Sequence, residues 1–315
     1  MKLKKILSLV LAGVMALCVT GCVNQHPEET TSTNESREVR LVATSPAVVQ
    51  ICNRLDLDLV GICQSTSDLP ERYDGVTTVG MAMNPDLEII KSLDPDYILS
   101  PATLQNDLQP KYASIGVSSL FLNLKSVEGM YASIGVSSLF LNLKSVEGMY
   151  ASIEGLGEKF GREEEAAVML EEFDSFMTEF AEKNAGKESP KVLVLMGLPG
   201  SYIIATDNSY VGSLVKFAGG TNVYGDGDGQ EFLFANTEDM KTKEPDVILR
   251  AAHGLPEEAR KMFAEEFSTN DIWQHFKAVQ EGRVYDLDSN LFNMSANFSY
   301  EEALKALQPM LCGEE

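Results

Sequence analysis

The sequence predicts an α/β protein of two lobes, each built around a largely parallel sheet, joined by one long backbone helix. Three observations predict this fold. Strand-like and helical runs alternate on both sides of the middle of the chain, one long amphipathic stretch interrupts the alternation, and the two sides share a segment of similar sequence. Parallel strands need crossover helices, so the alternation favours βα units over hairpins.

The first lobe is expected over residues 40–161. It opens with a strand at 40–44 and a helix from Pro46 to Arg54, because Ser45 is a favourable N-cap and proline suits the first helical turn. The elements expected next are a strand at 57–63, a helix at 85–93 and a strand at 97–100.

A long helix is expected to link the lobes over residues 162–188. Apolar side chains recur at helical spacing in its first 22 residues, 162–183, a length of about 33 Å at the α-helical rise. Residues 185–190, Ala-Gly-Lys-Glu-Ser-Pro, end it. The second lobe, 189–315, should then contain strands at 191–197, 246–250 and 283–287 and a helix at 209–219.

An internal correspondence supports two equivalent lobes. Leu87–Leu99 can be aligned with Thr237–Leu249, and in each segment a glutamate, Glu88 or Glu238, precedes a Pro-Asp pair by seven residues. A simple reuse of one helix-to-strand turn would explain the match equally well, and such reuse also argues for equivalent lobes.

A second repeat is of a different kind. Residues 131–149 repeat residues 112–130 without one difference over 19 positions. Structural repeats normally diverge, so this identity indicates a recent tandem duplication or an assembly error. Each copy carries the apolar strand Val-Ser-Ser-Leu-Phe-Leu-Asn-Leu. A lobe built for one such strand must place the second at an edge or loop it out, and we predict that the extra copy destabilises the fold.

The N-terminus predicts export. A basic start precedes an apolar run that ends at Gly21, and the run of 16 residues from Ile6 is shorter than the roughly 20 needed to span a bilayer. Val-Thr-Gly-Cys22 resembles a bacterial lipobox, which implies a signal peptide over 1–21, a lipid on Cys22 and a location on the extracytoplasmic face of the cell membrane. Residues 22–39 lack periodic apolar residues and are expected to form a flexible tether.

The charge excludes several partners. Three of the 25 basic residues and none of the 47 acidic ones lie in 1–21, so the net charge of −22 becomes −25 after processing. A surface this acidic is repelled by nucleic acid and by anionic lipid. Membrane contact is therefore expected through the lipid anchor only.

Recognised catalytic motifs are absent from the sequence, which favours a binding protein over an enzyme. There is no Gly-x-Ser-x-Gly elbow, no His-Glu-x-x-His and no P-loop. Asp226–Glu231 is interpreted as an acidic turn rather than a calcium loop. Cys52 and Cys63 are expected to be buried free thiols, since the cysteine spacings match no zinc pattern.

Two residues are candidate ligands. His253 follows the strand that ends at Arg250, at the sheet edge where α/β proteins bind ligands, and it either binds a metal or haem iron or stabilises a turn. Met83 lies in a Gly-Met-Ala-Met-Asn-Pro loop, and its thioether either suits haem iron or copper(I) or packs locally. His275 is expected at the surface or in packing.

Several segments resemble the substrate-binding lipoproteins of class III ABC importers for iron-siderophores, cobalamin and haem. The matching segments are 43–46, 79–88, 93–99, 217–222 and 279–285, and the resemblance spans about 40–311 apart from the duplicated insert. Met-Asn-Pro-Asp together with Ala-Ala-His-Gly-Leu-Pro-Glu-Glu is most similar to the IsdE-type haem-binding lipoproteins.

This resemblance implies a function and a site. Haem (iron protoporphyrin IX) would be the transported ligand, held between the lobes by Met83 and His253, with Met81 as the alternate methionine. Binding would rest on the iron bonds and on apolar burial of the porphyrin. Glu88 and Glu238 would dock to the permease, which acts with its ATPase, and surface haem-binding proteins would act upstream. A siderophore or cobalamin on the same scaffold is the alternative; a secreted hydrolase or an adhesion module is disfavoured.

Overall fold

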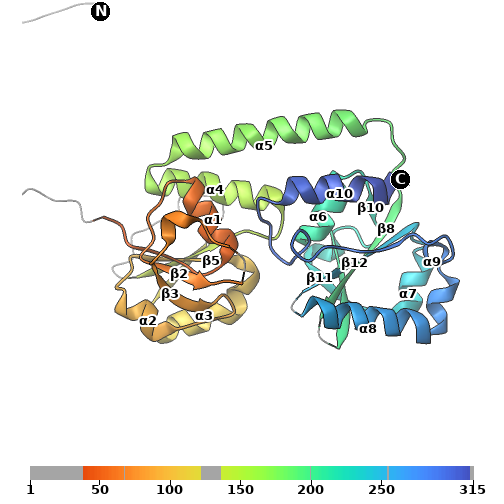
Figure 1. The fold of residues 1–315 in the computed structure, drawn as a ribbon, viewed down its shortest axis with the longest axis horizontal. Coiled ribbons are helices and arrows are strands. Elements are labelled where there is room, and N and C mark those ends of the chain that lie inside the picture. The colour runs from red at the N-terminus through yellow and green to blue at the C-terminus, as the bar shows by residue number, and fades with distance from the viewer. Residues whose placement is uncertain (1–37, 67, 122–135, 199, 254, 313–315) are drawn as a thin grey trace, which may run out of the picture. The chain divides into compact units, whose positions relative to one another are not determined.

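The computed structural model describes residues 38–66, 68–121, 136–198, 200–253 and 255–312. Within these residues the chain forms two sheets, of seven and six strands, with helices packed around them (Figure 1). This confirms the predicted α/β fold with two lobes. The predicted signal peptide, Cys22 and nearly all of the tether lie outside the described residues.

The first sheet has the strand order β4-β3-β2-β1-β5-β7-β6. All neighbouring strands are parallel except β3 and β4. Its elements up to the duplicated segment are β1 (Leu41–Ala43), α1 (Pro46–Arg54), β2 (Gly61–Gln64), β3 (Thr77–Met81), β4 (Asn84–Pro85), α2 (Leu87–Ser92), β5 (Tyr97–Pro101) and α3 (Gln105–Ser114). The Ser45 hydroxyl accepts a hydrogen bond from the Val48 N–H at 3.4 Å, as expected of an N-cap.

Two predicted boundaries in this lobe were wrong. The strand predicted at 57–63 begins only at Gly61, because residues 55–57 still close the end of α1; the Leu57 N–H, for example, donates to the Cys52 carbonyl at 2.9 Å. The helix predicted from Pro85 begins at Leu87, because Asn84 and Pro85 pair with β3 and Asp86 is the N-cap.

Both copies of the duplicated segment contribute a strand. The first copy forms β6 (Ser118–Phe121) and the second forms β7 (Ser137–Leu141). Ser118 pairs with Ser137 and Phe121 with Phe140, so each residue lies beside its own counterpart 19 positions later. The second copy occupies the place next to β5, and the first copy takes the sheet edge. Residues 122–135 between them lie outside the described part of the chain.

The linking helix is α5 (Glu163–Asn184), 22 residues long, which lies beside α4 (Val146–Phe160) and α10 (Tyr300–Cys312) in Figure 1. It ends four residues before the predicted limit of 188. The Tyr150 ring stacks on Phe173 with centroids 4.3 Å apart, and Tyr300 packs edge-on against Phe173 and Phe176. One buried cluster therefore runs through these helices and into both sheets.

The second sheet has the order β11-β9-β8-β12-β13, with β10 beside β8. The predicted strands are found as β8 (Lys191–Leu198), β12 (Val247–Ala252) and β13 (Val284–Asp286), and the predicted helix as α6 (Tyr210–Phe217). The remaining strands and α-helices are β9 (Ser201–Ala205), β10 (Thr221–Asn222), β11 (Phe232–Phe234), α7 (Thr237–Thr242), α8 (Pro256–Thr269) and α9 (Lys277–Gln280). The sheet departs from the parallel prediction at β9, which pairs antiparallel with β8 because two residues are too few for a crossover.

The internal correspondence is also structural. Helices α2 and α7 begin and end 150 residues apart, and each is followed by a strand in the same place. The carboxylate before each strand anchors the central strand of its sheet: Asp96 accepts from the Arg40 N–H at 2.8 Å, and Asp246 from the Lys191 N–H at 3.0 Å.

The cysteines agree with their prediction. Cys52, Cys63 and Cys312 are free thiols, and burial raises the pKa of Cys52 and of Cys63 to about 12. Among the described residues, no helix is both long and apolar enough to cross a membrane.

Candidate ligand site between the two lobes

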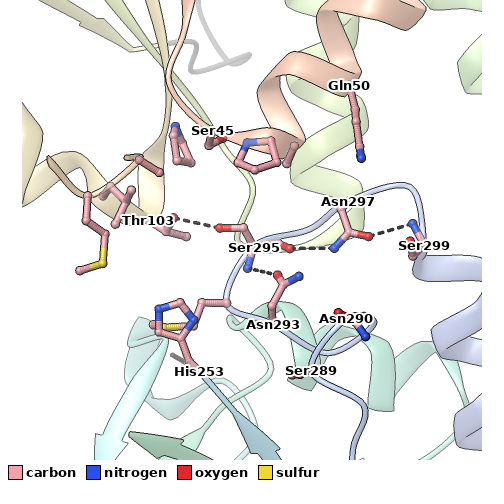
Figure 2. A pocket seen from close by; sticks show the side chains of 17 residues that line it. Ser45, Gln50, Thr103, His253, Ser289, Asn290, Asn293, Ser295, Asn297 and Ser299 are labelled. Atoms are coloured by element: carbon pink, nitrogen blue, oxygen red, sulfur yellow. Dashed lines mark hydrogen bonds between the residues drawn. The ribbon is translucent and has the colours of Figure 1, made fainter. Parts of the chain in front are cut away.

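A cavity of about 470 Å³ lies where residues of both lobes meet (Figure 2). Its volume falls in the usual range for small-molecule sites. The residues that line it are Ser45, Pro46, Ala47, Gln50, Ala82, Met83, Pro101, Thr103, Leu104, His253, Ser289, Asn290, Asn293, Met294, Ser295, Asn297 and Ser299. It lies at the carboxyl ends of β1, β5 and β12, the edge at which open α/β sheets bind ligands.

Met83 and His253 line this cavity from opposite lobes. Met83 lies between β3 and β4 and is 58% exposed, and His253 follows β12 directly. The His253 N–H donates to the Gly197 carbonyl at 2.9 Å, which extends the β12–β8 pairing to the cavity edge. Met81 instead lines a neighbouring cavity of about 280 Å³ that shares Pro46, Ala82 and Met83 with the first.

Burial changes the acid–base behaviour of His253. Loss of solvent around the imidazole lowers the pKa of His253 below its ordinary value of 6.5. The ring is therefore neutral at neutral pH, which is the form that binds metals. The other described histidine, His275, is exposed, as expected.

The wall of the cavity across from Met83 and His253 is polar, a feature that the sequence did not predict. Residues 289–299, between β13 and α10, contribute amides and hydroxyls, and Gln50 on α1 adds another amide (Figure 2). The expected apolar enclosure is therefore only partial. An Asn- and Ser-rich run after the strand at 283–287 was the available signal, but it has no periodicity and no recognised motif.

Glu88 and Glu238 occupy equivalent places on the two lobes. Each is exposed in the first turn of its helix, where a carboxylate complements the helix dipole. The N-caps are equivalent too: Asp86 accepts from the Glu88 N–H at 3.0 Å, and Asn236 from the Glu238 N–H at 3.1 Å.

The acidic segment Asp226–Glu231 is the remaining candidate. The Asp226 carboxylate accepts a hydrogen bond from the Asp228 N–H at 3.2 Å, within the acidic turn that the sequence predicts. In the part of the chain that the structure describes, no group of three or more His, Cys, Asp or Glu side chains could hold a metal ion.

The fold and the cavity define a two-lobed ligand-binding protein. The chain belongs to the periplasmic binding protein family, whose model matches residues 41–291. It is 39% identical over 308 residues to the high-affinity heme uptake system protein IsdE of Staphylococcus aureus strain Newman, covering 98% of this chain and 97% of that protein.

Two solved structures are similar over most of the chain. An ABC transporter substrate-binding protein from Listeria monocytogenes EGD-e superposes with a TM-score of 0.78 at 44% identity, covering 88% of this chain and 100% of that one. S. aureus IsdE complexed with heme superposes with a TM-score of 0.76 at 39% identity, covering 87% of this chain and 99% of that one. The family resemblance is thus confirmed, as is the prediction of a substrate-binding protein rather than an enzyme.

Proposed function

We propose that this protein binds haem between its lobes, with Met83 and His253 as axial ligands, and delivers it to the permease of an ABC importer. One observation carries the proposal: the two candidate ligands come from opposite lobes and line one cavity. It is strengthened by the full-length similarity to a protein named for heme uptake.

The chemistry of the two side chains suits haem iron. A thioether and a neutral imidazole are common axial ligands of haem, and burial keeps the imidazole of His253 neutral. Haem also carries two carboxylates, and the amides of Gln50 and Asn290 on the polar wall are suitable donors for them.

The proposed delivery involves three further residues, Cys22, Glu88 and Glu238. A lipid on Cys22 would hold the protein on the extracytoplasmic face of the membrane, within reach of its permease. Glu88 and Glu238, exposed at equivalent places on the two lobes, would dock to basic pockets of that permease, which acts with its ATPase. Surface haem-binding proteins would supply the ligand.

The test of the ligand is a hemin titration of residues 23–315. The purified protein should give a sharpened Soret band with low-spin features. A Met83→Ala change should alter this spectrum, whereas Met81→Ala and His275→Ala, the matched controls, should leave it unchanged. The absence of any Soret change in the unmodified protein would favour a siderophore or cobalamin instead. An effect of Met81→Ala but not of Met83→Ala would identify Met81, instead of Met83, as the methionine that binds iron.

The pH dependence tests the state of His253. Protonation removes the imidazole from iron, and burial places the pKa of His253 below 6.5. In the ligand-free protein, an NMR titration of the His253 imidazole should therefore have its midpoint below pH 6.5, so that most of the ring is neutral and available to iron at that pH. A midpoint at or above pH 6.5 would contradict the proposed environment of the ring.

Docking is tested separately from binding. Glu88→Ala and Glu238→Ala should each lower haem uptake by the reconstituted transporter and leave the hemin spectrum intact. Glu182→Ala, on the exposed end of α5, is the matched control. Normal uptake by the double variant at positions 88 and 238 would refute the docking role.

A further inference from the structure

The segment between β13 and α10 touches the first lobe at two consecutive residues. The Ser295 hydroxyl lies 3.1 Å from the Thr103 hydroxyl, and the Ala296 N–H donates to the Leu143 carbonyl at 2.7 Å. We call these four residues the clasp. Thr103 and Ser295 both line the ligand cavity, so the clasp joins the lobes at the cavity itself (Figure 2).

The segment is held rigid by its own side chains. The Asn293 side-chain oxygen accepts from the Ser295 N–H at 2.9 Å, and that of Asn297 accepts from the Ser299 N–H at 2.8 Å. Such turns fix the backbone on either side of the clasp. Ala296 is fully buried, which removes its amide from competition with water. The Ser295 hydroxyl is therefore presented to Thr103 from a preformed loop.

The first-lobe end of the clasp is linked to the candidate ligand Met83. Thr103 lies just after β5, the position equivalent to His253 after β12. Thr103 also leads into α3, whose Lys111 ammonium donates to the Met83 carbonyl at 3.0 Å and to the Asn84 side chain at 3.2 Å. Movement at the clasp is therefore transmitted to Met83 on one side and to the cavity wall of the second lobe on the other.

We infer that Thr103 and Ser295 are positioning residues whose hydrogen bond sets the span that Met83 and His253 must bridge. This inference rests on the proposed haem function. The aromatic cluster of Tyr150, Phe173, Phe176 and Tyr300 joins the lobes along α4, α5 and α10, and none of its four members lines the cavity. That cluster serves as the pivot, and the clasp limits how far the cavity opens around it.

The clasp predicts an unequal effect on the two iron bonds. The imidazole of His253 is fixed close to a strand end, whereas the thioether of Met83 is on a flexible, largely exposed side chain. Loosening the clasp should first release the methionine. The ferric complex should then shift from six-coordinate low-spin towards five-coordinate high-spin while the histidine bond remains.

The experiment compares Thr103→Val and Ser295→Ala with the unmodified protein. Each change removes one hydroxyl at little cost in volume. Each should raise the rate of haem loss to apomyoglobin roughly three- to tenfold, the factor expected for one hydrogen bond, and increase the high-spin fraction. The double variant should match the single variants, because both remove the same bond. Thr242→Val is the control, since its hydroxyl donates within its own helix to the Asp239 carbonyl.

A second measurement does not need haem. In the ligand-free protein, hydrogen exchange at the Ala296 amide should be faster in Thr103→Val than in Thr242→Val, because the Leu143 bond lies beside the lost one. Unchanged exchange, or additive effects in the double variant, would overturn the clasp. If the unmodified protein fails to bind hemin, the proposed function fails, and the exchange measurement still decides whether the clasp exists.

Discussion

The helix–strand units of the two lobes, α2–β5 and α7–β12, share one framework and differ at the ligand-facing ends of their strands. Both have a capped six-residue helix, a left-handed residue before the strand, at Asp94 or Glu244, and an aspartate that binds the neighbouring strand. Beyond the strand, the first lobe presents Thr103 and the second presents His253. The common unit places a side chain at the cavity, and the residue type there decides its chemistry.

The strands also differ in what holds them. Ser100 in β5 joins the hydroxyls of Thr44 and Tyr112, at 2.8 and 2.9 Å, in a buried network. The equivalent residue of β12, Arg250, forms a two-pronged ion pair with Asp286. Equivalent backbones thus accommodate a neutral hydrogen-bond network in one lobe and an ion pair in the other.

The largest expected difference lies between the two ligands. His253→Ala should weaken haem binding about a hundredfold, and Met83→Ala only about tenfold, because the half-buried imidazole is held at the end of β12 whereas the thioether is largely exposed and mobile. Equilibrium titration with hemin measures both. Equal losses would show that the lobes contribute equally, contrary to the asymmetry inferred here.

The shared aspartates should have similar effects on stability. Asp96→Ala and Asp246→Ala should each lower the free energy of unfolding by about 2 kcal/mol, since each removes a charged acceptor from a backbone N–H. Urea unfolding measures both variants, and Asp74→Ala, a change at an exposed position, is the control. The pKa of Asp246 is lowered, chiefly by the hydrogen bond from the Lys191 N–H. The stabilisation that Asp246 contributes to the fold should therefore be present above pH 3.8 and disappear as the pH falls through the lowered pKa.

The N-caps offer a smaller comparison. Asp86→Ala and Asn236→Ala each remove a side chain that accepts from two N–H groups of the first turn. Each should cost about 1 kcal/mol in urea unfolding. Asp86→Asn should retain most of the stability, and a full loss in that variant would mean that charge rather than capping matters.

The smallest expected effect concerns the extra strand of the first lobe. Deleting 112–130 or 131–149 yields the same sequence, because the copies are identical. The single-copy protein keeps a strand beside β5 and lacks the added edge strand, so its melting temperature should be slightly higher than that of the full chain. A lower melting temperature would contradict the prediction that the extra copy destabilises the fold.

Local signals allowed the sequence to predict α1, α5 and β8 closely, because caps, long apolar periodicity and a proline break define them. The starts of β2 and α2 were missed because their boundaries depend on hydrogen bonds to other elements, such as Val60 N–H to the Leu41 carbonyl at 2.8 Å. Sequence could not tell which copy of the repeat lies at the edge. In the structure the second copy continues into α4 and takes the place beside β5. The polar wall was missed because Ser295 meets Thr103 across 192 residues.

The buried cluster that crosses from one sheet to the other through α4, α5 and α10 has a thermodynamic consequence. Residues 39–315 form one compact unit, and we therefore expect the two lobes to unfold in a single cooperative transition instead of one after the other. A ligand that binds only the folded cavity then stabilises the whole unit. At a free concentration one hundred times its Kd, that amounts to about 2.7 kcal/mol for both sheets together. A bound ligand is thereby expected to stabilise even the edge strand β6 against unfolding.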